Sequence, residues 1–158
     1  MNPITYISGD ATSPIADGHK IIAHICNDIG AWGKGFVVAI SRKWSLPESA
    51  FKDWYANREE NDFALGAIRV VPVTEDISVA NMIGQRDIRS RNGVPPIRYE
   101  AVRKCLSALR EEAQSTHSSI HMPRIGWGLA GGEWSEIEPI ILNELSNHDL
   151  AVTVYDYR

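Results

Sequence analysis

The sequence has no excess of positive charge and no long apolar run. Sixteen Lys and Arg residues against twenty Asp and Glu residues give a formal net charge of −4. This balance disfavours non-specific nucleic-acid binding, which depends on excess positive charge against phosphate. No apolar stretch approaches the roughly 20 residues that cross a bilayer, and the first ten residues lack the basic and apolar regions of a secretory signal. We therefore expect a soluble cytoplasmic protein with no membrane partner.

Cysteine is scarce, and metal-binding spacings are missing. Cys26 and Cys105 lie far apart and match no metal or redox motif. The five histidines show no ligand spacing either. A chain of 158 residues buries roughly 70% of its unfolded surface, so its core needs neither a metal nor a disulfide. We expect reduced thiols, no metal and no cofactor.

Internal repeats and low-complexity linkers are absent as well. Hydrophobic residues make up 44% of the chain and charged residues 23%, which is typical of a globular protein rather than a disordered or fibrous one. The length fits one domain, so residues 1–158 are predicted to form a single unit.

The hydrophobic pattern predicts strands that alternate with helices. Residues 20–26 form a nearly continuous apolar run, which is typical of a strand buried on both faces. Further strands are expected over residues 5–7, 67–73, 77–83, 119–122 and 150–155, and helices over 36–44, 48–58, 99–113 and 133–145. This alternation predicts an α/β fold with a largely parallel sheet covered on both faces. Ligands of such folds bind beyond the carboxyl ends of the strands.

A first glycine-rich loop, residues 27–35, directly follows the buried strand. Its three glycines permit positive φ and a close approach of a ligand to the main chain. The amides that open the next helix carry partial positive charge, so a diphosphate fits there even though the chain is acidic. The spacing is neither a Walker loop nor G-x-G-x-x-G, and a tight turn is the alternative. Asn27 either binds a sugar hydroxyl or caps the loop.

A second glycine-rich loop, residues 123–134, follows a later strand and again opens a helix. Four glycines within residues 126–132 are more than a simple connection needs. Arg124 either faces phosphate or pairs with a surface carboxylate. Of the five tryptophans, Trp32 and Trp127 are the two in glycine-rich loops, so we expect both to contact a ligand.

Taken together, these stretches resemble the macrodomain family. Ile4–Asp10 is similar to the family's opening strand with its Gly-Asp adenine contact, Ala23–Gly35 to its distal-ribose loop, and Met122–Leu129 to its phosphate loop. The closing Thr153–Tyr155 resembles the last strand of the branch of the terminal ADP-ribose protein glycohydrolase. The Gly-x-Trp-Gly-x-Gly of the first loop is similar to that of the yeast-type ADP-ribose 1″-phosphate phosphatase in the same branch.

The resemblance implies a three-layer α/β/α sandwich with a mixed, largely parallel sheet that binds ADP-ribose in a cleft over the sheet. It implies that Asp10 accepts a hydrogen bond from adenine, that Tyr155 stacks near it, and that Asn27 contacts the distal ribose. A capping role for Asp10 and strand-end packing for Tyr155 are the alternatives. The implied ligand-binding residues are Asp10, Ala11, Asn27, Trp32, Gly33, Lys34, Gly35, Phe36, Pro123, Arg124, Ile125, Gly126, Trp127, Gly128, Leu129, Ala130, Gly131 and Tyr155.

The sequence departs from this branch at its two catalytic positions. Ala130 stands where the glycohydrolase has an aspartate, and Gly84-Gln85 where its lysine falls. Neither supplies a nucleophile, so a covalent lysyl intermediate at these positions is excluded. We expect hydrolysis of ADP-ribosyl esters on glutamate and aspartate by a positioned water, with Asn27 and Gln85 as catalytic residues. Asp87 is either a base or an exposed turn residue.

Two other functions stay open. A phosphatase acting on ADP-ribose 1″-phosphate would use His24 as its acid or base, although a histidine in a buried strand is more often structural. A non-enzymatic reader would bind ADP-ribose and release nothing. The expected partners are ADP-ribose and ADP-ribosylated proteins, with nucleic acid only as a modified substrate. The basic loop 86–93 either approaches that substrate or is a solvated loop.

Overall fold

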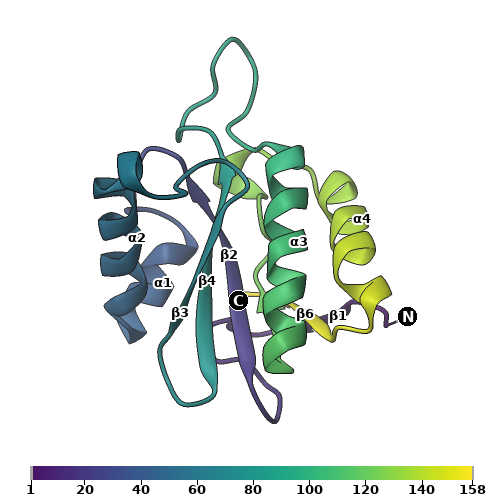
Figure 1. Cartoon of the computed structure of the whole chain (residues 1–158). Coiled ribbons are helices and arrows are strands. Elements are labelled where there is room, and N and C mark those ends of the chain that lie inside the picture. The colour runs from purple at the N-terminus through teal and green to yellow at the C-terminus, as the bar shows by residue number, and fades with distance from the viewer. Residues whose placement is uncertain (1, 158) are drawn as a thin grey trace.

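A computed structural model describes residues 2–157, apart from the side chain of Leu129. One sheet of six strands runs through the described chain, with helices on both faces (Figure 1). The strands are β1 Thr5–Ser8, β2 Lys20–Asn27, β3 Ile68–Pro72, β4 Ile77–Gln85, β5 Ser119–Met122 and β6 Val152–Asp156. Their order is β1-β6-β5-β2-β4-β3, and β3 pairs antiparallel with β4 while the other pairs are parallel.

The helices lie in two layers. They are α1 Phe36–Lys43, α2 Leu46–Ala56, α3 Tyr99–Thr116 and α4 Trp134–Glu144, with short 3-10 turns at η1 Arg58–Glu60, η2 Gly128–Ala130 and η3 Ser146–His148. In Figure 1, α1 and α2 lie on one side of the sheet and α3 and α4 on the other. The predicted three-layer α/β/α sandwich with a mixed, largely parallel sheet is therefore confirmed.

The alternation of side chains along β2 explains why its sequence is apolar throughout. Ile22 packs with Ile40 of α1 on one face of the sheet, whereas Ile21 and Ala23 join the core beneath α3 and α4 on the other. Successive residues of a strand point to opposite faces, so a strand covered on both sides needs apolar residues at every position.

Several predicted elements differ from the observed ones at their ends. β4 continues two residues beyond the predicted 83, so Gly84 and Gln85 belong to the strand and not to the loop that follows it. α3 continues three residues beyond the predicted 113 and ends where His117 takes a left-handed conformation with φ of 54°. Both extensions depend on tertiary pairing and packing, which local sequence patterns report poorly.

The carboxyl ends of the parallel strands meet at one edge of the sheet, where residues 28–35, 86–98 and 123–133 and the first part of the connection 9–19 form loops. The register of β2 and β4 places Asn27 beside Gln85 at this edge. The long connection between β4 and α3 projects beyond it (Figure 1). The arrangement therefore brings both glycine-rich loops to the same rim.

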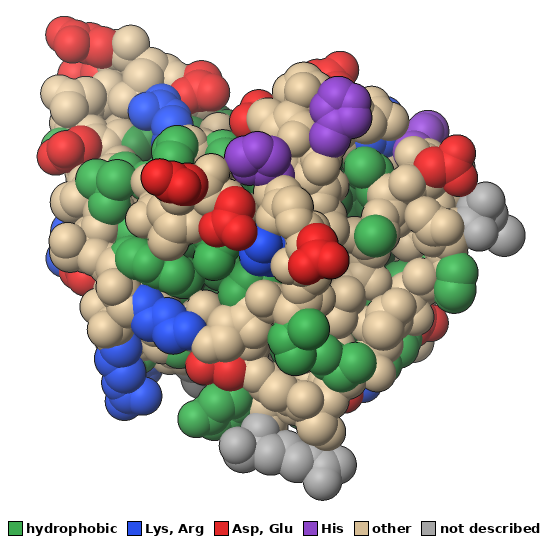
Figure 2. Space-filling view, turned by 90° about the horizontal axis from the view of Figure 1, so that it is seen from below, with side chains coloured by type: hydrophobic (Ala, Val, Ile, Leu, Met, Phe, Trp, Pro, Cys, Tyr) green, Lys and Arg blue, Asp and Glu red, His purple; other side chains and the backbone are tan. Residues whose placement is uncertain are grey.

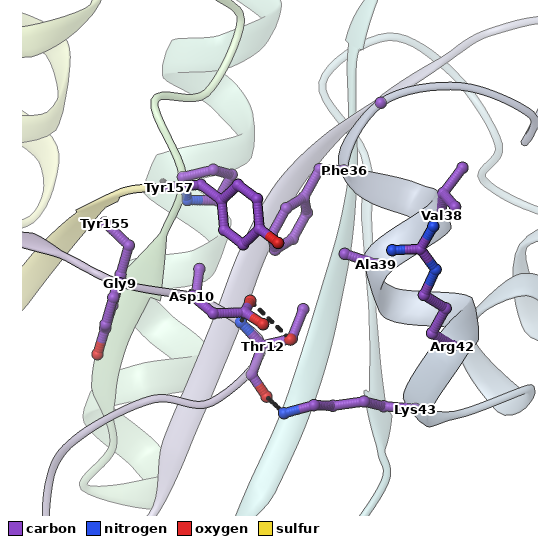
Figure 3. A pocket seen from close by; sticks show the side chains of 13 residues that line it. Gly9, Asp10, Thr12, Phe36, Val38, Ala39, Arg42, Lys43, Tyr155 and Tyr157 are labelled. Carbon is purple, nitrogen blue, oxygen red and sulfur yellow. Dashed lines mark hydrogen bonds between the residues drawn. The ribbon is translucent and has the colours of Figure 1, made fainter.

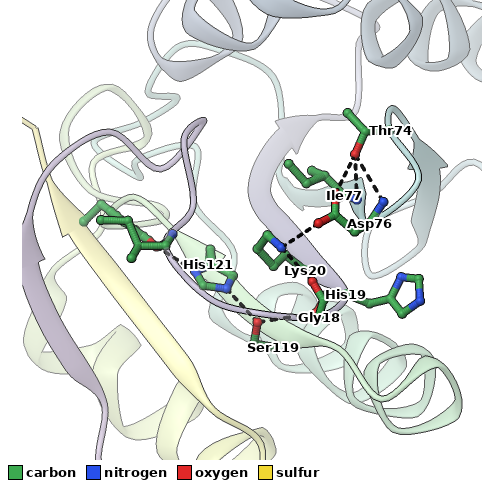
Figure 4. Close-up of polar contacts among 10 residues, drawn as sticks. Gly18, His19, Lys20, Thr74, Asp76, Ile77, Ser119 and His121 are labelled. Carbon is green, nitrogen blue, oxygen red and sulfur yellow. Dashed lines mark hydrogen bonds and ion pairs between the residues drawn. The ribbon is translucent and has the colours of Figure 1, made fainter.

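The opposite edge of the sheet is closed by internal polar contacts. Lys20 is almost fully buried there, and its Nζ donates to Gly18 O at 2.6 Å and pairs with Asp76 at 2.9 Å (Figure 4). Figure 2 views this edge from below and shows acidic and histidine side chains over it. The buried Lys20 at this edge is thus already neutralised by Asp76.

Residues 2–157 were also searched for membrane-spanning helices, metal-binding groups and disulfides. No helix among them is long and apolar enough to span a membrane. None of their His, Cys, Asp and Glu side chains forms a group of three that could hold a metal ion. Cys26 and Cys105 are both free thiols and both buried.

Candidate functional site

Three adjoining cavities form one groove along the rim. The β1 cavity, of about 490 Å³, lies between the end of β1 and helix α1. The central cavity, of about 280 Å³, lies between the two glycine-rich loops. The β4 cavity, of about 390 Å³, lies beside the ends of β2 and β4. The central cavity shares Gly35, Phe36 and Pro123 with the β1 cavity and Lys34, Val37 and Gln85 with the β4 cavity, so the groove is continuous.

The β1 cavity is bounded by a turn that Asp10 caps. Asp10 Oδ1 accepts hydrogen bonds from the amide and the hydroxyl of Thr12, at 2.8 and 2.7 Å. Lys43 of α1 reaches across and donates to Thr12 O at 2.7 Å (Figure 3). The turn is therefore held in place from both ends, and the Asp10 carboxyl group lines the cavity that it bounds.

Tyr155 is a buried wall of the same cavity. Its hydroxyl accepts a hydrogen bond from the amide of Ile15 at 2.9 Å and lies 2.7 Å from Nδ1 of His121. Burial raises the pKa of the Tyr155 phenol, so the group stays protonated near neutral pH. The ring therefore has the strand-end packing role foreseen as an alternative, and it also faces the groove.

The amino end of α1 opens into the groove without a side-chain cap. Gly35 is the N-cap residue, with φ of 81° and ψ of −145°, a conformation that favours glycine. No side chain bonds to the cap, and no acidic residue lies in the first turn of the helix. The unsatisfied amides of a helix start carry partial positive charge, so this end of α1 can bind an anion.

Asn27 holds the first loop in shape. Its Nδ2 donates to Ala31 O at 2.7 Å, and its Oδ1 accepts from the amides of Ile29 and Ala31 at 3.1 and 2.9 Å. Both acceptor positions of the amide oxygen are thereby occupied, and one N–H remains. The Asn27 side chain therefore caps the loop, as one of the two alternatives proposed, and it also lines the β4 cavity.

Trp32 lines none of the three cavities. Its Nε1 donates to Ser41 Oγ at 2.8 Å, and its ring packs against His24 and Phe51 at centroid distances of 5.4 and 5.5 Å. The half-buried indole thus supports the first loop from the core side. We predicted that Trp32 contacts a ligand, and the packing of its ring against the core does not favour that contact.

His24 is a neutral core residue. It is 2% exposed, and burial lowers its pKa to about 4. Asn81 donates its amide N–H to Pro47 O at 3.0 Å, so its Oδ1 faces His24 and accepts from Nε2 at 2.6 Å. The proton of the neutral ring therefore lies on Nε2. The candidate acid or base of a phosphatase is thus held uncharged and already bonded.

The second loop depends on close backbone contact at its glycines. The amide of Gly132 donates to Gly126 O at 2.7 Å, and Gly126 has φ of 71°. A Cβ on Gly132 would lie 2.3 Å from that oxygen, so a side chain there would force the loop apart. Trp127 projects from the loop with 61% of its surface exposed and lines the central cavity.

Arg124 lines the central cavity but is engaged within the protein. Its Nε and a terminal nitrogen donate to the two carboxylate oxygens of Asp156, at 2.7 and 3.2 Å. The guanidinium also lies over the rings of Tyr6 and Trp134. Of the two roles proposed for Arg124, facing phosphate or pairing with a carboxylate, the structure shows the second.

Gln85 lies where the central and β4 cavities meet. Its Nε2 donates to Asp87 O at 2.9 Å, and the amide of Asp87 donates to Asp28 Oδ1 at 2.7 Å. The Asp87 carboxylate accepts from the Ile88 amide and pairs with Arg91, and these contacts hold its pKa below the usual range. Asp87 is therefore a turn residue with an occupied carboxylate, and not the base suggested as one possibility.

The groove brings together most of the predicted residues. Those that line it are Asp10, Ala11, Asn27, Gly33, Lys34, Gly35, Phe36, Gln85, Pro123, Arg124, Ile125, Gly126, Trp127, Ala130 and Tyr155. Gly128 and Gly131 line none of these three cavities, and the side chain of Leu129 lies outside the described residues.

Several lining residues were not predicted from the sequence, and most of them lie on regular elements or on the β4–α3 connection. They are Thr12, His24 as a lining residue, Ile25, Cys26, Ala31, Val37, Val38, Ala39, Arg42, Lys43, Ile88, Arg89 and Tyr157. Gly9 also lines the groove and belongs to the predicted Gly-Asp adenine contact. The spacing of Phe36, Ala39 and Lys43 along one face of α1 was an available signal, because residues three and four apart share a helix face.

Comparison with known proteins gives the family. No family model matches the sequence. A solved structure of a protein of unknown function from Bacteroides thetaiotaomicron is 54% identical, with 98% of each chain covered and a TM-score of 0.95. A macrodomain protein from Streptomyces coelicolor is 47% identical, with 99% of this chain and 100% of that chain covered and a TM-score of 0.90.

Two curated relatives are more distant. An ADP-ribose 1″-phosphate phosphatase from Lodderomyces elongisporus is 25% identical, over 97% of this chain and 99% of its own. The chromodomain-helicase-DNA-binding protein 1-like of Danio rerio is 29% identical over 98% of this chain, which spans 16% of that much longer protein. With nearly half of its residues identical to those of the Streptomyces protein over the whole of both chains, the chain belongs to the macrodomain family.

Proposed function

We propose that this protein binds ADP-ribose and hydrolyses the ester that links it to glutamate or aspartate side chains of other proteins. The continuous groove at the carboxyl ends of the strands carries this proposal. ADP-ribose is an elongated molecule with a base at one end, two phosphates in the middle and a sugar at the other end. Three joined cavities with two glycine-rich loops at the middle one match that order of parts.

The proposed placement follows from the chemistry of each cavity. Adenine occupies the β1 cavity beside Asp10 and Tyr155, where a carboxylate accepts from the exocyclic amine and an aromatic ring offers a stacking face. The diphosphate occupies the central cavity, where the uncapped start of α1 and the second loop supply backbone amides. The distal ribose then occupies the β4 cavity beside Gln85.

Hydrolysis in this arrangement needs no protein nucleophile. Water attacks C1″ as the bond from C1″ to the ester oxygen breaks, and the electron pair stays on the leaving carboxylate. The transition state resembles the oxocarbenium ion of glycoside hydrolysis. The water proton passes to solvent. Because a carboxylate is a good leaving group, holding water and sugar in position supplies much of the rate enhancement.

Gln85 is the residue proposed to position the water. Its Nε2 is fixed by Asp87 O, and among the described residues none donates to its Oε1. The amide oxygen therefore has capacity to accept a hydrogen bond from an attacking water. Asn27 contributes by holding the loop beside it, and one remaining N–H of its amide can contact the ribose.

The test is release of free ADP-ribose from glutamate-, serine- and nucleic-acid-linked substrates. We expect release from the glutamate ester, and a lower rate for Gln85→Ala with the affinity for ADP-ribose retained. Asn27→Ala should lower both the hydrolysis rate and the affinity for ADP-ribose, because the substitution removes the hydrogen bonds that hold the first loop. Unchanged hydrolysis in Gln85→Ala would remove this residue from the mechanism. Tight binding without release from any substrate would make the protein a reader.

A second candidate, dephosphorylation of ADP-ribose 1″-phosphate, is favoured by the names of curated relatives. The environment of His24 opposes histidine catalysis in such a reaction, because the ring is neutral, buried and bonded to Asn81. Release of inorganic phosphate from ADP-ribose 1″-phosphate, measured against release of ADP-ribose from the ester, decides between the two activities.

A further inference from the structure

The connection between β4 and α3 carries unpaired positive charge beside the groove. We call residues 86–94 of this connection the arginine loop. Its Arg91 pairs with Asp87. By contrast, Arg86 and Arg89 are exposed, and neither side chain makes a hydrogen bond or a salt bridge among the described residues. The charge of Arg89 acts only at longer range on the Asp87 carboxylate, which Arg91 already pairs. In a chain with a net charge of −4, two unpaired arginines at one place are a local exception.

The base of the arginine loop is tied to the site. Asp87 is held from two sides, since its amide donates to Asp28 Oδ1 and its carbonyl oxygen accepts from Gln85 Nε2. The amide of Arg86 donates to Pro96 O at 2.8 Å. At the tip, Arg91 and Val94 exchange two backbone hydrogen bonds of 3.0 and 2.9 Å. These contacts form a small hairpin, so its side chains project from a defined frame next to Gln85.

The arginine loop forms one wall of the β4 cavity. Ile88 and Arg89 line that cavity, and Lys34 lines it from the first loop. Among the described residues that line it, none is acidic. Under the proposed function, this cavity receives the distal ribose, and the acceptor of the ester leaves the groove here. The molecule that carries the ADP-ribose therefore lies next to the arginine loop and its Arg89.

We propose that the arginine loop binds the acceptor side of the substrate as an acidic peptide segment around the modified glutamate, with Arg89 as its main contact. This inference rests on the proposed function, which places the ester in the β4 cavity. Unpaired cations attract carboxylates that flank the modified residue, and electrostatic complementarity of this kind sets partner choice and association rate.

The apolar residues of the arginine loop favour a peptide over a nucleic acid. Ile88 is 48% exposed and Val94 is 49% exposed, so the cations stand among aliphatic side chains. A peptide offers both carboxylates and aliphatic carbon to such a surface. Binding of a nucleic-acid backbone depends on many phosphate contacts, for which an acidic chain with two free arginines here is poorly suited.

The experiment compares two peptides of equal length, each with one ADP-ribosyl glutamate, flanked either by aspartate and glutamate or by serine and alanine. Both kcat/KM and the dissociation constant are measured at low salt. We expect the wild type to prefer the acidic peptide by about three- to tenfold, the size of one or two exposed charge pairs. Arg89→Glu should abolish the preference, and Arg89→Lys should keep it.

The matched control is Arg103→Glu, which makes the same charge change on the exposed face of α3 and should leave the ratio between the peptides as it is. An equal ratio in the wild type and Arg89→Glu would overturn the inference. So would tighter, Arg89-dependent binding of an ADP-ribosylated oligonucleotide, which would assign the loop to nucleic acid. If the wild type hydrolyses neither peptide, the proposed function fails, while the ratio of dissociation constants still decides the role of Arg89.

Discussion

Replacing His24 by glutamine tests how the core of this protein responds to acid. The folded protein holds this imidazole neutral down to a pKa of about 4, whereas the unfolded chain binds a proton near 6.5. The stability that the neutral ring provides is therefore complete above pH 6.5 and is lost as the pH falls towards 4. These two values make the unfolding free energy about 2 kcal/mol lower at pH 4.5 than at pH 7 from this residue alone.

The assay is urea unfolding of the wild type and His24→Gln at both pH values. Glutamine is uncharged throughout and can still donate to Asn81, so the variant lacks only the titration. The carboxylates and His121, whose pKa burial also lowers to about 4, contribute equally to both proteins and cancel in the difference. The wild type should lose about 2 kcal/mol more than the variant. Equal losses would refute a buried, neutral His24.

Three further substitutions test the loops of the groove. Gly132→Ala places a Cβ 2.3 Å from Gly126 O, so urea unfolding should show a free energy of unfolding lower by about 1–3 kcal/mol. Calorimetry should show weaker ADP-ribose binding, and a stable variant that binds tightly would contradict the loop geometry. Asn27→Asp sets two oxygens against each other at Ala31 O, and a loss of about 1–3 kcal/mol is expected in the same assay at pH 7. Tyr155→Phe keeps the cavity wall but removes a bonded hydroxyl, which should cost about 1 kcal/mol in thermal unfolding and leave ADP-ribose affinity nearly unchanged; a large loss of affinity would mean that the hydroxyl itself contacts the ligand.

The fold could be predicted from the sequence because its signals are local and repeated. The apolar run of β2 requires cover on both faces, and helical spacing between strands supplies that cover. The position of the groove follows from the same pattern, since glycine-rich loops after parallel strands meet at one edge.

The roles of single polar residues could not be predicted in this way. Arg124 pairs with Asp156, 32 residues away on a neighbouring strand, and no local pattern reports that contact. Asn27 was predicted as either a ribose ligand or a loop cap, and only the path of the backbone to Ala31 shows that its side chain caps the loop. Trp32 turns towards Phe51 because the α1–α2 layer offers it an apolar surface.

The central claim is that one continuous groove holds ADP-ribose from end to end. Titration of the isotope-labelled protein with ADP-ribose, followed by backbone amide shifts, tests it most directly. We predict one saturable site whose amide shifts concentrate in residues 9–13, 27–36, 85–89 and 123–132. AMP should shift the amides of residues 9–13 and of the start of α1, but not those of residues 85–89. Absence of binding at millimolar ligand, or saturation with shifts only at the Lys20 edge of the sheet, would contradict the account.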